Sequence, residues 1–191
     1  IFMFLAGVNF ALHYRFLLGR WGAFWRDEEF RFYTVLTVFC TLTVTFVLRL
    51  HGTYDSFVDA LRFGAFQVVS IITTTGYVTA DYELWPTYTQ FILLLLMFCG
   101  AMAGSTAGGL KVSRVVLYAK TARAEFRRQR EPGRIVPVVF NGKPISREAQ
   151  RSLFGYLCIY LTAFLFFLLV TSLDAPDFLS AFSAVAATFN N

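Results

Sequence analysis

Long uncharged apolar runs alternate with short polar segments along the whole chain. Three of these runs, at 32–48, 84–110 and 153–173, reach or approach the roughly 20 residues that a bilayer-spanning helix needs. The pattern predicts an all-α integral membrane protein, with spans over 33–50 and 153–173 and a third apolar segment over 86–118.

The composition favours the same class of protein. Apolar residues make up 57% of the 191 residues, aromatic residues 18% and charged residues 15%. A water-soluble chain of this length lacks the interior to bury so many apolar side chains. Secreted disulfide scaffolds, most soluble enzymes and nucleic-acid readers are therefore excluded, despite a net charge of +5. We expect a lipid bilayer around the chain and no nucleic-acid partner.

Basic residues give the topology. Fifteen of the 17 Lys and Arg residues lie in two segments, 15–31 and 111–151, which the positive-inside rule places in the cytoplasm. The remaining connections are mostly acidic, as expected of the outer face. The spans then alternate in direction along the chain. The basic segments are interpreted as solvated topology signals rather than as binding sites for nucleic acid or specific lipids.

One apolar segment, 63–80, must begin and end on the outer side of the membrane. Ser56, with Asp59 three residues later, predicts the start of a helix over 56–72. Such a helix is roughly 24 Å long, too short to cross the bilayer and return. We therefore predict a re-entrant loop, in which the helix ends at membrane depth and is followed by a Thr-Thr-Thr-Gly-Tyr segment over 73–77. Non-helical backbone at that depth has to be buried in protein or to line a water-filled path.

The chemistry at the end of this short helix favours a monovalent cation. A helix C-terminus carries a partial negative charge, and the segment that follows it holds Thr and Gly but no carboxylate or His. Backbone carbonyls can replace the hydration shell of a large monovalent ion, whereas a divalent ion prefers carboxylates. Spacing alone leaves two interpretations open, an ion site and an ordinary helix C-cap buried in protein.

The same plan begins again about 120 residues later. A span, an acidic turn and a short apolar helix over 177–189 precede Asn190 and Asn191. Repeats of span, half-helix and span are typical of pores. We predict a covalently repeated unit as in potassium channels, and we expect the chain to be the interior of a longer polypeptide. Its predicted parts are the end of an inner helix and a cytoplasmic connection (1–32), one complete repeat (33–118, with span 33–50, pore helix 56–72, filter 73–78 and broken inner helix 86–118), a cytoplasmic linker (119–151) and the start of another repeat (152–191, with span 153–173 and pore helix 177–189).

Four Gly residues with Ser and Thr interrupt the apolar run within 100–109. The segment fails as a phosphate-binding loop, because Leu110 stands where the lysine should be and no strand precedes it. Small residues there allow either close helix packing or a break in the helix. We favour the break, at the depth of the inner half of a pore.

No span carries an acid, Lys or His at its centre, and the three Cys residues have no metal-like spacing. We therefore expect neither an enzyme nor a covalently bound cofactor. Two other classes of protein are considered, a polytopic membrane scaffold without transport and a subunit of a tetrameric potassium channel. Two non-identical short helices in one chain disfavour the channel subunit.

Four segments together carry a family resemblance. They are FQVVSIITTTGY at 66–77, ADYELWP at 80–86, GAMAGSTAGGLK at 100–111 and FNN at 189–191. The sequence resembles the membrane subunit of the Trk-type bacterial potassium transporters (TrkH), in a superfamily shared with Ktr and plant HKT transporters. The likeness covers essentially all 191 residues and places the complete unit as the third repeat of four.

The resemblance implies one pore per subunit, formed by four covalently joined repeats in the bacterial inner membrane. It also implies a multi-pass homodimer that works with a cytoplasmic nucleotide-binding regulatory subunit (TrkA-like), and K⁺ as the transported ion. Residues 152–191 would then begin the fourth repeat.

The resemblance implies particular sites as well. K⁺ would be bound by backbone carbonyls of Thr74, Thr75, Gly76 and Tyr77, with the metal itself at Thr74, Thr75 and Gly76, and Asn190 and Asn191 would begin the fourth filter strand. Compared with the Thr-Val-Gly-Tyr-Gly filter of tetrameric channels, this segment has Val78 in place of the second Gly. An intramembrane loop would act as the gate through Gly100, Gly104, Ser105, Thr106, Gly108, Gly109 and Lys111.

The predicted topology can be tested by cysteine labelling in the full-length protein without its native cysteines. A single cysteine beside Ser146 should react with a membrane-impermeant thiol reagent only from the cytoplasm, and one beside Tyr82 only from outside. Labelling of both positions from the same side would contradict the topology and the re-entrant loop.

Overall fold

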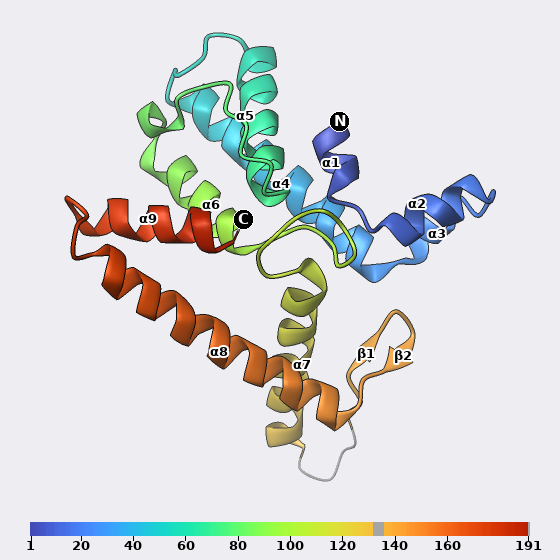
Figure 1. Cartoon of the computed structure of the whole chain (residues 1–191). Helices are drawn as coiled ribbons and strands as arrows, with labels where there is room; N and C mark the ends of the chain where they lie inside the picture. The colour runs from blue at the N-terminus through green and yellow to red at the C-terminus, as the bar shows by residue number, and fades with distance from the viewer. Residues whose placement is uncertain (132–135, 191) are drawn as a thin grey trace.

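The computed structural model describes residues 1–131 and 136–190 and is almost entirely helical (Figure 1). The long helices are α4 (Glu28–Leu50), α5 (Phe57–Ile72), α7 (Val112–Arg130) and α8 (Arg147–Thr171). The shorter elements are α1 (Phe2–Ala6), α2 (Phe10–Leu17), α3 (Ala23–Arg26), the 3₁₀ turn η1 (Tyr82–Leu84), α6 (Thr87–Phe98), α9 (Phe178–Phe189) and a hairpin of β1 (Val139–Phe140) and β2 (Lys143–Pro144).

Within the described residues, α4 and α8 are long and apolar enough to cross a membrane, and α6 and α9 are shorter apolar helices. α4 begins where the Asp27 side chain accepts a hydrogen bond from the Phe30 N–H at 2.9 Å. The 23 residues of α4 span about 34 Å at 1.5 Å per residue, close to the thickness of the hydrocarbon core. Both spans predicted from the sequence are therefore present as single helices.

α5 is the short helix predicted from the sequence. Its N-cap is Ser56, whose hydroxyl oxygen accepts a hydrogen bond from the Val58 N–H at 3.2 Å. The helix packs along α4, and Gly64 is where the two approach closely, since a Cβ there would lie 3.3 Å from side-chain atoms of Val44 and Thr45. α5 ends at Ile72, and the chain returns by η1 to α6.

The third apolar segment is broken, as predicted. α6 ends at Phe98 and α7 begins at Val112, and the residues between them, 99–111, form a non-helical loop that we call the intramembrane loop. Its two ends pair with each other, because the Gly100 N–H donates to the Leu110 carbonyl at 2.8 Å and the Val112 N–H donates to the Ala101 carbonyl at 3.1 Å. The closed shape of the loop is thus set by its own backbone.

α8 and α9 repeat the plan of α4 and α5. α8 is capped by Ser146 and α9 by Asp177, and α9 folds back along α8 toward the intramembrane loop (Figure 1). The stretch 119–151, expected to be a linker, contains the second half of α7, the hairpin and the start of α8. α7 ends at Arg130.

The N-terminal segment, predicted to contain the end of an inner helix, is not one continuous helix. It is broken between Ala6 and Phe10. A Cβ at Gly7 would lie 2.5 Å from the Tyr33 hydroxyl, and the Asn9 side chain starts α2 by accepting from the Ala11 N–H at 2.8 Å. The break exposes backbone groups that the intramembrane loop uses, since the Met102 N–H donates to the Gly7 carbonyl at 3.1 Å.

The interior consists of two clusters. The larger one joins α4, α5 and α6 to the intramembrane loop through residues such as Tyr33, Val68, Leu93 and Met102. The smaller one joins α8 and α9 to α6 around Phe164. Many large apolar side chains of α4 and α8 point away from both clusters, among them Phe39, Phe46, Ile159, Phe166 and Leu169. Such surfaces are typical of helices that face lipid or other membrane helices.

Candidate functional site

The segment after α5 has an unusual backbone. Thr73 is the C-cap of α5, and its hydroxyl donates to the Val69 carbonyl at 2.7 Å. Thr74 and Gly76 both have positive φ, of 52° and 76°. Positive φ is common for Gly but rare for a β-branched residue such as Thr. The chain is thus turned out of the helix within three residues, so the following carbonyls leave the helical hydrogen-bonding pattern.

Three successive carbonyl groups in this segment are free of hydrogen bonds. Within the part of the chain that the structure describes, no donor reaches the carbonyl oxygens of Thr74, Thr75 and Gly76. The Tyr77 carbonyl differs, because it accepts from the Ser70 hydroxyl at 2.6 Å. Thr75 and Gly76 are exposed, so these carbonyls are open to water or to an ion, and the partial negative charge of the helix C-terminus favours a cation beside them.

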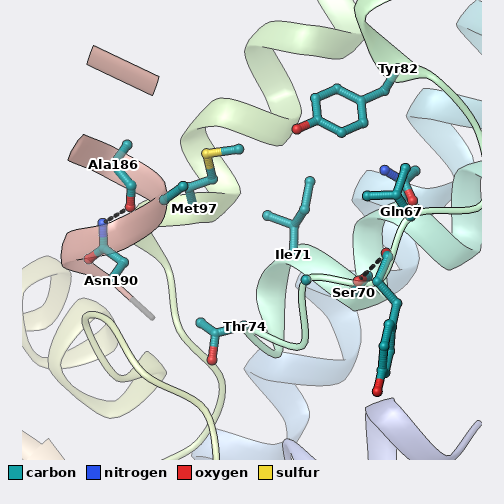
Figure 2. Close-up of a pocket in the computed structure, with 12 residues that line it drawn as sticks. Gln67, Ser70, Ile71, Thr74, Tyr82, Met97, Ala186 and Asn190 are labelled. Atoms are coloured by element: carbon teal, nitrogen blue, oxygen red, sulfur yellow. Dashed lines mark hydrogen bonds between the residues drawn. The ribbon is translucent and has the colours of Figure 1, made fainter. Parts of the chain in front are cut away.

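Contacts with α5 hold this segment in place. The Ser70 carbonyl accepts from the Thr75 N–H at 2.9 Å, and the hydroxyls of Thr73 and Thr75 are 2.7 Å apart. The bond from the Ser70 hydroxyl to the Tyr77 carbonyl is the dashed line drawn beside Ser70 in Figure 2. Hydrogen bonds to α5 and between neighbouring residues therefore hold the segment that carries the free carbonyls.

A cavity of about 200 Å³ separates the end of α5 from the end of α9. Figure 2 shows Ser70, Thr74 and Gln67 on one side of it and Met97, Ala186 and Asn190 on the other. Gln67 is fully buried, and its amide has no hydrogen-bond partner among the residues described. Gln67 lies one helical turn before Ser70, so both polar side chains of this otherwise apolar stretch face the cavity.

Asn190 is fixed at the end of α9. It is 2% exposed, its amide oxygen accepts from the Tyr160 hydroxyl, and its amide nitrogen donates to the Ala186 carbonyl at 2.8 Å. Two hydrogen bonds therefore hold the side chain of the residue that was expected to begin the fourth filter strand. Asn191, named with it from the sequence, lies outside the described residues.

The intramembrane loop joins the two helix ends. The Gly108 N–H donates to the Thr74 hydroxyl at 2.9 Å, and a Cβ at Gly109 would lie 3.4 Å from the Asn190 amide oxygen. Gly104 and Gly109 have positive φ, of 72° and 64°. The loop thus lies directly against both segments that the sequence assigned to ion binding.

Further contacts fix the remaining residues assigned to the loop. The Ser105 hydroxyl donates to the Met102 carbonyl at 2.6 Å, the Thr106 hydroxyl donates to the Ala6 carbonyl at 3.2 Å, and the Lys111 ammonium donates to the Ala107 carbonyl. The structure therefore brings every described residue predicted for the filter and the gate into one connected region.

Two contributors were missed from the sequence. Ser70 was not recognised as a tether, although a hydroxyl a few residues before the Thr run was a usable signal. Glu29 was not recognised either; its buried carboxylate accepts from the backbone N–H groups of Ala103 and Ser113, at 2.7 and 2.8 Å. Its place at the polar end of a span makes Glu29 indistinguishable in sequence from a solvated acid.

The chain has a span, a short helix that stops inside the fold and a broken return helix, and then a second span and a second short helix. This order of elements defines an all-α membrane transport architecture built from repeats. The chain matches the family model of the TrkH cation transport proteins over residues 1–191. It belongs to that family, which consists of transport proteins and not of enzymes.

Individual relatives of known name support this family membership. The chain is 34% identical to the Trk system potassium uptake protein TrkH of Salmonella typhimurium and 35% identical to that of Escherichia coli K12, over 100% of this chain and 40% of each relative. The crystal structure of the potassium transporter TrkH from Vibrio parahaemolyticus superposes with a TM-score of 0.92 at 34% identity, over 99% of this chain and 41% of that one. The chain thus spans about 40% of the length of these relatives.

The packing of the intramembrane loop predicts the effect of Gly100→Ala. The new Cβ would lie 2.0 Å from the Gly108 carbonyl oxygen, so the backbone must shift, and overpacking of this kind costs about 1–3 kcal/mol. We expect a lower melting temperature for the full-length protein in detergent. Gly155→Ala is the matched control, because it lies within α8 with open space around it; it should leave the melting temperature unchanged or raise it. Equal melting temperatures for the two variants would contradict the described loop.

Proposed function

We propose that this chain forms part of a potassium uptake pore in the bacterial inner membrane. The observation that carries the proposal is the row of three free carbonyls, at Thr74, Thr75 and Gly76, directly after α5. Membership of a cation transport family and the names of the relatives, which are potassium uptake proteins, support K⁺ as the ion.

The chemistry of the segment matches this ion. The partial negative charge at the C-terminus of α5 favours a cation, and carbonyl dipoles without a carboxylate suit a large monovalent ion. Tyr77 anchors the segment in this proposal and is not one of the ligands. One of the two lone pairs of its carbonyl accepts the hydrogen bond from Ser70, so Thr74, Thr75 and Gly76 provide the ligands. No covalently bound cofactor is required.

The chain contributes one complete repeat and the start of a second to the structure that surrounds the pore. Residues 33–118 are the third repeat, with its filter at 73–78, and residues 152–191 begin the fourth, with Asn190 and Asn191 at the start of its filter strand. Residues 1–32 end the second repeat and 119–151 connect the third to the fourth. The likeness of α4 and α5 to α8 and α9 supports this division.

The intramembrane loop is the gate. It lies against Thr74 of the third filter and Asn190 of the fourth, which is where an obstruction below both filters would have to be. Its Gly residues lower the stability of helix by about 1 kcal/mol each relative to Ala, so a bent loop is favoured over a straight helix that would leave the path open.

The assembled transporter is a homodimer with a cytoplasmic, TrkA-like nucleotide-binding regulatory subunit. α7 offers a basic surface for that subunit, with Arg127 and Arg130 exposed near its end. This surface follows the intramembrane loop directly, so a partner bound to α7 acts on the gate through one helix.

Replacement of Gly76 tests the ion site. A side chain at φ of 76° is strained by roughly 1–2 kcal/mol, so Gly76→Ser should turn the filter carbonyls and lower the preference for potassium over sodium. Gly142→Ser is the matched control, with φ of 75° in the hairpin turn; a Cβ at either glycine would enter open space, with no contact within 4 Å.

The measurement is isotope uptake of potassium and of sodium by liposomes that contain the full-length protein. We expect reduced potassium preference for Gly76→Ser and unchanged preference for Gly142→Ser. Wild-type preference in both variants would refute a role of Gly76 in binding the ion.

A further inference from the structure

Glu29 is a buried acid at the start of α4. Its side chain lies among protein atoms and the residue is 5% exposed. A carboxylate in such a place is stable only with strong hydrogen-bond partners. One of its oxygens, Oε1, accepts from the Ala103 N–H at 2.7 Å and from the Ser113 N–H at 2.8 Å. Both partners are backbone groups of the broken helix, 74 and 84 residues further along the chain.

The two partners have different positions in the broken helix. Ala103 lies in the intramembrane loop, whereas Ser113 is the second residue of α7. The first N–H groups of a helix have no partner within it, and Lys111, the N-cap of α7, makes no side-chain cap bond. Glu29 therefore acts as the cap of α7 from another helix, where the helix dipole also favours a negative charge.

From these contacts we infer that Glu29 is the positioning residue that holds the intramembrane loop in its obstructing place. The inference rests on the proposed function of the loop as a gate. A single oxygen ties the middle of the loop and the start of α7 to the rigid α4, and charge-assisted hydrogen bonds are about twice as strong as neutral ones. The loop cannot move away from the filter segment while both bonds remain. Figure 1 shows the loop at the centre of the molecule, directly before α7.

The neighbouring acid provides a matched control. Glu28 precedes Glu29 on the same turn, but its carboxylate pairs with the Lys120 ammonium, and its side chain is 24% exposed. No hydrogen bond connects that carboxylate to the intramembrane loop in the described part of the chain. Glu28→Gln thus removes the same charge from the same helix end and leaves the tether intact.

Hydrogen exchange of the full-length protein, followed by mass spectrometry of peptides that cover 99–113, measures the tether directly. In Glu29→Ala the amides of Ala103 and Ser113 lose their acceptor, and we expect the peptide to exchange roughly tenfold faster than in wild type. Glu29→Gln keeps an uncharged acceptor oxygen and should exchange about threefold faster. Glu28→Gln should exchange at the wild-type rate.

Potassium flux into liposomes without the regulatory subunit is the second readout. Glu29→Ala should raise it at least about threefold, and Glu28→Gln should not change it. If neither Glu29 variant exchanges faster than Glu28→Gln, the tether is refuted. Faster exchange with unchanged or lower flux would also overturn the inference, because the loop would then not be held in an obstructing place. Absence of potassium flux in wild type would instead refute the proposed function, and the exchange result would still report on the tether.

Discussion

One hydrogen bond, from the Gly108 N–H to the Thr74 hydroxyl at 2.9 Å, joins the end of α5 to the broken return helix. Thr74 has a φ of 52°, a conformation that costs a residue with a Cβ roughly 1–2 kcal/mol. The contact with Gly108 helps to offset that strain. Because the Thr74 carbonyl is also the first of the three free carbonyls, the shape of the proposed ion site and the position of the loop depend on the same residue.

The loop in turn depends on a second broken segment. Backbone groups freed between α1 and α2 pair with those of the loop, since the Met102 N–H donates to the Gly7 carbonyl and the Phe10 N–H donates to the Gly104 carbonyl, at 3.1 and 3.0 Å. Irregular backbone at membrane depth persists only where such partners exist. The free backbone groups of the two interrupted helices therefore satisfy each other's hydrogen bonds. The Glu29 carboxylate ties the intramembrane loop and the start of α7 to α4.

Features encoded by neighbouring residues could be predicted from the sequence. The start of α5 at Ser56 follows from local capping chemistry, and the break after α6 follows from the low helix propensity of its glycines. Features that depend on distant partners could not. The close approach of the Tyr33 hydroxyl leaves no room for a Cβ at Gly7, and Glu29 has a function only because the fold brings Ala103 and Ser113 to it. The positions of the candidate ligands were predictable from a family resemblance, but the tether from Ser70 to Tyr77 was not.

The central claim is that Thr74 couples the ion site to the intramembrane loop through its contact with Gly108, and the side chain of Thr74 tests it most directly. Thr74→Val keeps the backbone carbonyl but removes the acceptor of the Gly108 N–H, whereas Thr74→Ser keeps the hydroxyl. Flux of potassium and of sodium through the full-length protein in liposomes should show raised basal flux together with lowered potassium preference in the Val variant, and wild-type values in the Ser variant. Wild-type flux and preference in Thr74→Val would contradict the claim.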